Sequence, residues 1–396
     1  MGSSERRYDE SQLWARSGAM ALTGRAVGPP LPCAGSPASA VRAELDRLAE
    51  LGVSRLPGVE LLGERAAYTG NRRNAPFSVG GSFRILPAMD GWVGLSLARP
   101  SDVEQLSALI EAPVTDEPWR AVARWLGSRT AAEAVERIVI LGMAGAAVPD
   151  TEIAPRRPGV LTTPGGPRVR SAAPVVVDLT SLWAGPLCAH VLGMAGARVI
   201  KVESHRRPDA SRNGTPEFFD LLHAGHESVV LDFAADRTVV KRLVAQADVI
   251  LEASRPRALR QLGIDADAEA ARGAIWVSIT AYGRGGDEEM RIGFGDDIAA
   301  GAGLLAWDCD EPLPAGDALA DPLAGITAAA AVVAALRRPT GCLLDVSMHD
   351  IAVAARAEAD SGRGEASAVA PQRRSASGNA APFGRDTERI RSEFGA

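Results

Sequence analysis

From residue 172 onward, short runs of apolar residues alternate with longer amphipathic segments along the chain. Each run is rich in β-branched residues and is bounded by turn residues, which is typical of a buried strand. The runs are PVVVDLT (174–180), ARVIKVE (197–203), ESVVLDF (227–233), ADVILEA (247–253) and AIWVSIT (274–280). Helical patterns stand between them, as in AGPLCAHVLGMAG (184–196) and TVVKRLVAQ (238–246). Strands that alternate with helices predict an α/β fold over residues 172–355, a doubly wound parallel sheet of Rossmann-like type.

A different pattern precedes this region. FRILPAMDGWVGLSL (83–97) reads as two short strands around an Asp-Gly turn, and three amphipathic helical segments follow it up to about residue 142. The pattern predicts a small α+β domain over residues 54–155. The Pro/Gly-rich segment 156–174 then reads as a linker to the large domain.

The C-terminal segment 356–396 is poor in hydrophobic residues and rich in Ala, Ser, Gly and Arg. This composition predicts a mobile tail, with DTERIRSEF (386–394) as a terminal helix.

An internal repeat relates residues 12–51 to residues 297–336. Both segments run from a helix of small residues through a loop with Pro-Leu-Pro to an Ala-rich helix. When Gly35 and Gly316 are aligned, Ala40 of the first segment stands opposite Asp321 of the second. We therefore interpret residues 1–53 as a degenerate half-copy of the region around Asp321.

Composition narrows the function classes. The 396 residues are 46% hydrophobic and 23% charged, as in ordinary globular proteins, and the formal net charge of −6 argues against nucleic-acid or anionic-membrane partners. No apolar run has the length of a membrane span, and the polar start lacks the apolar core of a signal peptide. Four dispersed cysteines and five scattered histidines indicate neither a disulfide framework nor a metal site. The sequence thus predicts a cytoplasmic protein.

Asp321 stands where a loop meets an Ala-rich helix. A carboxylate in that position is stabilised by the helix dipole, and many such residues do no more than cap the helix. Asp317, four residues earlier, is an equally plausible cap. Asp321 therefore has two readings, a helix cap and a reactive carboxylate.

Two basic loops follow predicted strands. His205, Arg206, Arg207 and Arg212 come after the strand at 197–203, and Arg255, Arg257 and Arg260 come after the strand at 247–253. Ligands of open α/β sheets bind at the carboxyl ends of the strands, so these loops predict a site for a phosphate-bearing ligand; the alternative is a solvated surface. No GxGxxG follows the first strand, which disfavours a nicotinamide dinucleotide.

A short glycine loop, SVGGSF (78–83), is another candidate. The backbone N–H groups of Gly80 and Gly81 could face an anion, although most Gly-Gly pairs are simply turns.

Together these features resemble class III (CaiB/BaiF-type) CoA-transferases, a family that includes formyl-CoA and carnitine CoA transferases and α-methylacyl-CoA racemases. The resemblance rests on segments that follow one another in family order: 175–203, 221–233 (LLHAGHESVVLDF), 247–263 (ADVILEASRPRALRQLG), 276–286 (WVSITAYGRGG), the loop ending in Asp321, and 342–354 (CLLDVSMHDIAVA). The small domain precedes the large one here, whereas the family has the reverse order. The chain therefore resembles a permuted or partly duplicated member.

The resemblance implies CoA transfer from an acyl-CoA to a carboxylic acid through an aspartyl-CoA thioester on Asp321. It implies that Gly80 and Gly81 belong to the glycine loop over the active site. It also implies that residues in three loops contact CoA, and that Arg291 lies near a further contact. The loop residues are Trp183 and Ala184; His205, Arg206 and Arg207; and Ala253, Ser254, Arg255 and Arg257. The acyl-CoA is a substrate, so no separate cofactor or metal is implied, and a homodimer is expected.

Two alternatives stay open at this point. An acyl-CoA racemase would need an acid/base pair, and Asp296 stands where that branch has a histidine, which favours transfer. A non-catalytic CoA-binding protein is suggested by the half-copy without an aspartate and by the changed order of the domains. The intact Asp321 loop argues against it.

Overall fold

A computed structural model describes residues 9–115, 117–254, 256–286, 288–357 and 366–394. Its large domain is built on a seven-stranded sheet with the order β4-β12-β9-β8-β5-β6-β7. The strands are β4 (Val160–Pro167), β5 (Val175–Asp178), β6 (Arg198–Ser204), β7 (Glu227–Leu231), β8 (Val249–Glu252), β9 (Ile275–Thr280) and β12 (Thr340–Ser347). All neighbouring pairs are parallel except β4 with β12. The predicted doubly wound α/β sheet is confirmed.

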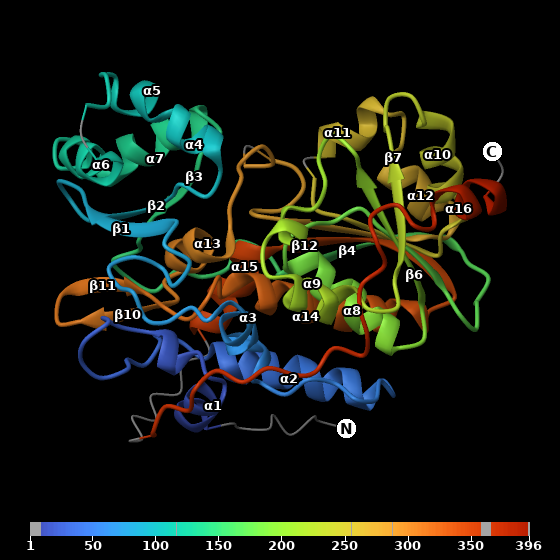
Figure 1. Ribbon diagram of the computed structural model, residues 1–396, viewed down its shortest axis with the longest axis horizontal. Coiled ribbons are helices and arrows are strands. Elements are labelled where there is room, and N and C mark those ends of the chain that lie inside the picture. Colours follow the sequence, from blue (N-terminus) through green and yellow to red (C-terminus); the bar gives the residue numbers. More distant parts are fainter. Residues whose placement is uncertain (1–8, 116, 255, 287, 358–365, 395–396) are drawn as a thin grey trace.

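Helices cover both faces of this sheet (Figure 1). Alternate side chains of the strands enter two cores, so that Val176 belongs to one and Val177 to the other. The first core contains residues of α8 (Ala184–Met194), α9 (Pro216–His223), α14 (Ala320–Leu336) and α15 (Met348–Ala357), and the second contains residues of α10 (Arg237–Gln246), α11 (Pro256–Gln261) and α12 (Ala266–Arg272).

The predicted linker at 156–174 is wrong in part, because β4 forms an edge strand of the large sheet, antiparallel to β12. Its side chains are mostly exposed, so no apolar pattern marks it. A Cβ on Gly166 would lie 1.9 Å from the carbonyl oxygen of Ala271, so the strand needs its glycines for close approach to α12. In the sequence these same glycines indicate a turn.

The small unit has an antiparallel sheet of β1 (Phe83–Pro87), β2 (Trp92–Ser96) and β3 (Ala144–Ala147). Its helices are α4 (Pro100–Glu104), α5 (Leu106–Ile110), α6 (Pro118–Leu126) and α7 (Ala131–Ile140). The predicted α+β character is confirmed, and these elements enclose a separate core. β3 was not predicted, because its sequence AGAA lacks β-branched residues.

The predicted boundary at residue 54 is wrong. Helix α3 (Leu61–Thr69) follows that boundary, yet Leu61 and Leu62 are buried in the core of the large domain. The small unit instead contacts the large domain through α13 (Gly295–Gly301), which lies against β2 and β3. The hairpin of β10 (Leu305–Asp308) and β11 (Glu311–Pro314) lies below β1 in Figure 1.

The N-terminal segment consists of α1 (Glu10–Arg16), the 3-10 helix η1 (Met20–Leu22) and α2 (Pro37–Glu50). Helix α2 lies along α14 (Figure 1), and its apolar stripe of Val41, Leu45 and Leu48 enters the same core as α14. The two segments that match in sequence therefore pack against each other, and Ala40 is partly buried at this contact.

The expected mobile tail is wrong for residues 366–394. The predicted terminal helix is present as α16 (Thr387–Glu393), and Ile390 and Phe394 are buried in the second core. Ala380 forms an isolated bridge with Ala224, and the Ser228 N–H donates to the Asp386 carboxylate at 2.9 Å. Polar anchors of this kind leave no hydrophobic pattern in the sequence. Residues 358–365 lie outside the described residues.

Across these described ranges, no helix combines the length and the apolar composition needed to cross a membrane.

Candidate active site

Asp321 lies in the first turn of α14 and is partly buried. The backbone N–H groups of Ala184, the first residue of α8, and of Gly295, the first residue of α13, lie close to its carboxylate and favour its charged form. A Cβ on Gly295 would lie 2.3 Å from Asp321 Oδ2, so only glycine allows this approach. The carboxylate is therefore at the N-terminal ends of two long helices, α8 and α14, where helix dipoles favour negative charge.

The environment shifts the acidity of this group. Burial raises the pKa of Asp321 to about 6, although Arg65 and the N–H groups of Ala184 and Gly295 act to lower it. Burial also raises the pKa of Asp296 to about 6, and Asp317 adds to that rise. At neutral pH both carboxyl groups are mostly ionised, and near pH 6 they are protonated about half the time.

Arg65 is the residue that sequence reasoning missed. It comes from α3, and its Nε donates to Asp317 Oδ2 at 2.9 Å while a terminal nitrogen bonds the other Asp317 oxygen. The guanidinium carbon lies 4.8 Å from the centre of the Trp183 ring. The sequence around Arg65 has the pattern of an ordinary amphipathic helix. It lies in the segment that was predicted to belong to the small domain, so nothing in the sequence indicated a place at this site.

The glycine loop lies beside the same helix. Gly80 and Gly81 are exposed, and Gly81 has a φ of +79° that favours glycine. Val79 packs with Ala66, the neighbour of Arg65, and with Leu22. The fold thus brings the loop next to the helix that carries Arg65, within a single chain.

The strand order places the crossover point of the large sheet between β5 and β8, because β6 and β7 extend to one side and β9 and β12 to the other. Ligands of such sheets bind outside the carboxyl ends of the strands at this point. Trp183 and Ala184 follow β5 and are both buried, and Ala184 lies beside Asp321. Ala253 and Ser254 follow β8, where Ala253 is exposed and Ser254 Oγ donates to Glu252 at 3.2 Å.

The remaining predicted contacts differ in placement. His205, Arg206 and Arg207 are exposed in the loop after β6, and Arg206 lies 3.3 Å from Asp232. Arg291 donates to the Tyr282 hydroxyl at 2.8 Å and to Glu288 at 2.6 Å. Arg255 lies outside the described residues. Arg257 belongs to α11, but its side chain also lies outside the described structure.

The model of CoA-transferase family III matches residues 174–384, more than half of the chain. This chain belongs to CoA-transferase family III.

Several relatives have CoA-transferase names. The "Probable fatty acyl-CoA transferase Rv3272" of Mycobacterium tuberculosis is 34% identical over 46% of this chain and 51% of its own length. The mouse succinyl-CoA:glutarate CoA-transferase is 31% identical over 45% of each chain, and the acetyl-CoA:oxalate CoA-transferase of Acetobacter aceti is 28% identical over 48% of this chain and 53% of its own. The chain spans about half the length of the curated relatives it matches.

Solved structures show the same partial coverage. The crystal structure of Rv3272 from M. tuberculosis gives a TM-score of 0.44 at 32% identity, covering 49% of this chain and 58% of that one. A CaiB/BaiF family protein from Brucella suis gives a TM-score of 0.42 at 30% identity, covering 46% and 53%.

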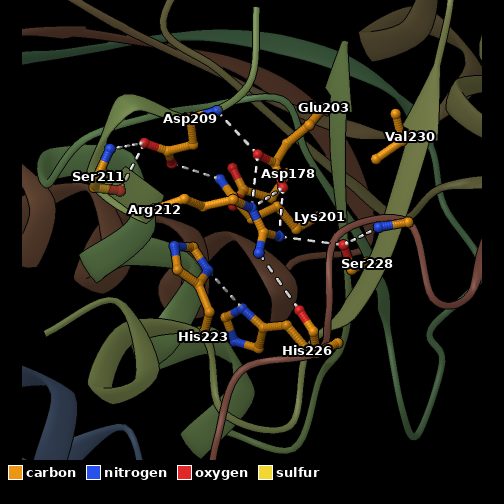
Figure 2. Close-up of polar contacts among 12 residues, drawn as sticks. Asp178, Lys201, Glu203, Asp209, Ser211, Arg212, His223, His226, Ser228 and Val230 are labelled. Atoms are coloured by element: carbon orange, nitrogen blue, oxygen red, sulfur yellow. Dashed lines mark hydrogen bonds and ion pairs between the residues drawn. The ribbon is translucent and has the colours of Figure 1, made fainter. Parts of the chain in front are cut away.

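Beneath the loop that carries Trp183, this family III chain has a buried polar cluster, shown in Figure 2. Lys201, only 1% exposed, lies 3.0 Å from Asp209 and 3.7 Å from Asp178, and it donates to the Thr180 carbonyl at 2.9 Å. Asp209 in turn accepts the N–H of Leu182 at 3.1 Å. Because Leu182 directly precedes Trp183, the cluster fixes the loop between β5 and α8.

Arg212 was one of the candidate phosphate ligands, but it points into this cluster and pairs with Glu203 at 2.6 Å. His223 and His226 face each other with their Nδ1 atoms 3.3 Å apart. Burial lowers the pKa of His226 to about 3 and that of His223 well below its ordinary value, so both rings are neutral. The contacts that the structure describes in this cluster indicate a structural role: the cluster stabilises the loop between β5 and α8 at the candidate site.

Proposed function

We propose that this chain transfers CoA from an acyl-CoA thioester to a carboxylic acid, with Asp321 as the nucleophile. The observation that carries the proposal is the position of the Asp321 carboxylate, in the first turn of α14 and beside the backbone N–H groups that begin α8 and α13, in a family III chain. A Cβ on Gly295 would lie 2.3 Å from both the Ala318 carbonyl oxygen and Asp321 Oδ2, so the glycine allows this close packing around the carboxylate.

The proposed reaction has four steps. An Asp321 oxygen attacks the thioester carbonyl, and the C–S bond breaks to give a mixed anhydride and CoA thiolate. The thiolate attacks the Asp321 carbonyl carbon and releases the donor acid as a carboxylate, which leaves an aspartyl-CoA thioester. The acceptor carboxylate attacks that thioester and expels the thiolate. The thiolate then attacks the acceptor's acyl carbon, forming the new acyl-CoA and freeing Asp321.

Each attack places negative charge on a carbonyl oxygen, which hydrogen-bond donors would stabilise. We assign this role to the backbone N–H group of Gly80. The Gly81 N–H, the other expected donor, already donates to the Ser78 carbonyl at 2.9 Å in this turn. The exposure of Gly80, and the packing of Val79 on α3 beside Arg65, support the assignment. CoA is a substrate in this scheme and no further cofactor takes part. A homodimer, measurable by light scattering, is part of the proposal.

The direct experiment is incubation of the chain with a panel of acyl-CoAs, followed by intact-mass analysis and peptide mapping. The proposal requires a CoA adduct on Asp321 and release of the free acid. Turnover without an adduct on Asp321 would contradict it.

Racemization of an acyl-CoA is the second candidate, because Asp296 and Asp321 provide two carboxyl groups with raised pKa values. Asp296 Oδ1 already accepts the Ala318 N–H at 2.9 Å, which supports a structural role for Asp296. In deuterated water a racemase would incorporate deuterium at the α-carbon of a 2-methylacyl-CoA. We expect transfer without such exchange.

The exposed arginines after β6 give a prediction about CoA binding. Replacing both Arg206 and Arg207 by alanine should raise the KM for acyl-CoA about tenfold with little change in kcat, because each would form a charge-assisted bond to phosphate far from the reacting carbon. Steady-state kinetics with acyl-CoA and with acyl-pantetheine, which lacks the nucleotide, measure this. Arg42→Ala, on the surface of α2, is the control. An equal rise in KM for acyl-pantetheine would place the nucleotide elsewhere.

A further inference from the structure

The charges around Asp321 are unbalanced. Asp317 from the loop before α14 and Asp296 from α13 add two carboxylates to that of Asp321, and the cation that faces them is Arg65 from α3. Asp317 is completely buried, whereas the Arg65 side chain keeps 29% of its surface exposed. Neighbouring negative charges favour the protonated form of a carboxyl group unless a cation offsets them.

Arg65 is held rigidly in this place. Two of its nitrogens bond the two oxygens of Asp317, and its planar guanidinium stacks over Trp183, which is 3% exposed. Trp183 directly precedes Ala184, whose N–H reaches the Asp321 carboxylate. The same short loop therefore positions both the cation and a hydrogen-bond donor for Asp321.

We propose that Arg65 is a positioning residue whose fixed charge keeps the Asp321 carboxylate ionised and nucleophilic at neutral pH. The inference rests on the proposed function of Asp321. It assigns a role in the active site to α3, a helix that precedes the segment matched by the family model.

The electrostatics support this role. Burial is the largest influence on Asp321 and raises its pKa, and Arg65 is the strongest influence in the opposite direction. Burial also works against the charge of Arg65, but Asp317, Asp296 and Asp321 outweigh it and raise the guanidinium's pKa, so Arg65 stays charged. Removing Arg65 should thus make Asp321 a weaker acid, and removing Asp317 should make it a stronger one.

The test is the pH dependence of the rate at which the CoA adduct forms in the first turnover, measured with acyl-CoA in excess. In the parent chain the rate should rise with pH around 6, as the Asp321 carboxyl loses its proton. Arg65→Gln should move this limb to higher pH by about one unit or more, and Asp317→Asn should move it to lower pH. The double variant should return toward the parent limb, and Arg65→Lys, which keeps the charge, should stay near it.

A merely structural Arg65 would give a different result. Its removal would lower the rate by the same factor at every pH, leave the limb where it was, and not be corrected by Asp317→Asn. That result would overturn the inference. If Arg65→Gln does not fold, the acid shift in Asp317→Asn, which keeps Trp183 and one of the two oxygens that Arg65 bonds, decides the question.

A second measurement separates this inference from the proposed function. The difference in unfolding free energy between the parent and an Asp321→Asn variant changes with pH around the Asp321 pKa, whether or not the chain catalyses anything. In the Arg65→Gln background we expect this change in the free-energy difference to occur at higher pH. An unshifted transition contradicts the role of Arg65, whereas absence of an Asp321 adduct in the parent contradicts only the proposed reaction.

Discussion

Replacing Asp321 by asparagine is expected to abolish CoA transfer, lowering kcat by at least about 10⁴-fold, because the amide cannot attack a thioester and no covalent CoA adduct can form. The fold should survive. Asparagine keeps one oxygen that can accept a hydrogen bond from Ala184 or Gly295, and it removes a charge that burial disfavours. We therefore expect a free energy of unfolding within about 1 kcal/mol of the parent value.

This prediction is checked by initial rates, by intact mass after incubation with acyl-CoA, and by chemical denaturation. Asp297→Asn is the matched control. Asp297 is also a buried aspartate, and burial raises its pKa to about 7, but its carboxylate faces Ser96 at 2.8 Å. The control should still form the adduct. If the Asp321 variant turns over and the Asp297 variant does not, the wrong carboxylate has been assigned.

The second large effect concerns the contact between α2 and α14. Val41→Asp should destabilise the chain by more than about 3 kcal/mol, because Val41 is fully buried in the core that α2 shares with α14. An unpaired carboxylate in that core either stays charged, at a large cost in the free energy of folding, or forces α2 away from α14. Since α14 begins with the residues around Asp321, activity should fall together with stability.

Ala43→Asp provides the comparison, because Ala43 is on the same helix but exposed. It introduces the same side chain and should cost less than about 1 kcal/mol, which corresponds to the helix propensity of aspartate. Thermal and urea unfolding measure both variants. Equal stability of the two would show that the N-terminal segment is a dispensable appendage and that its match to residues 297–336 has no structural meaning.

The sequence by itself determined most of the large domain. The strands β5 to β9 are short apolar runs between turn residues, and a pattern of that kind depends only on neighbours along the chain. The same holds for α14, whose Ala-rich sequence has a high helix propensity. Asp321 was identified from its local context, a carboxylate before such a helix, together with motifs in family order.

Segments whose contacts are polar or close-packed were not predictable in this way. Strand β4 has exposed side chains and glycines that its approach to α12 requires, and the C-terminal segment is fixed by bonds such as that between Asp386 and Ser228. Neither feature produces a periodic apolar pattern. Local composition therefore indicated a linker and a mobile tail where the fold has a strand and an ordered segment.

Only the tertiary structure decided what surrounds Asp321. Arg65 stands 252 residues before its partner Asp317, and the stacking on Trp183 joins a third part of the chain. The acidity of a buried carboxyl depends on the charges and the burial around it in space, and sequence separation does not encode these distances. The sequence thus singled out Asp321 as the proposed nucleophile, and the packing of α3 against the loop after β5 determined the charge placed beside it.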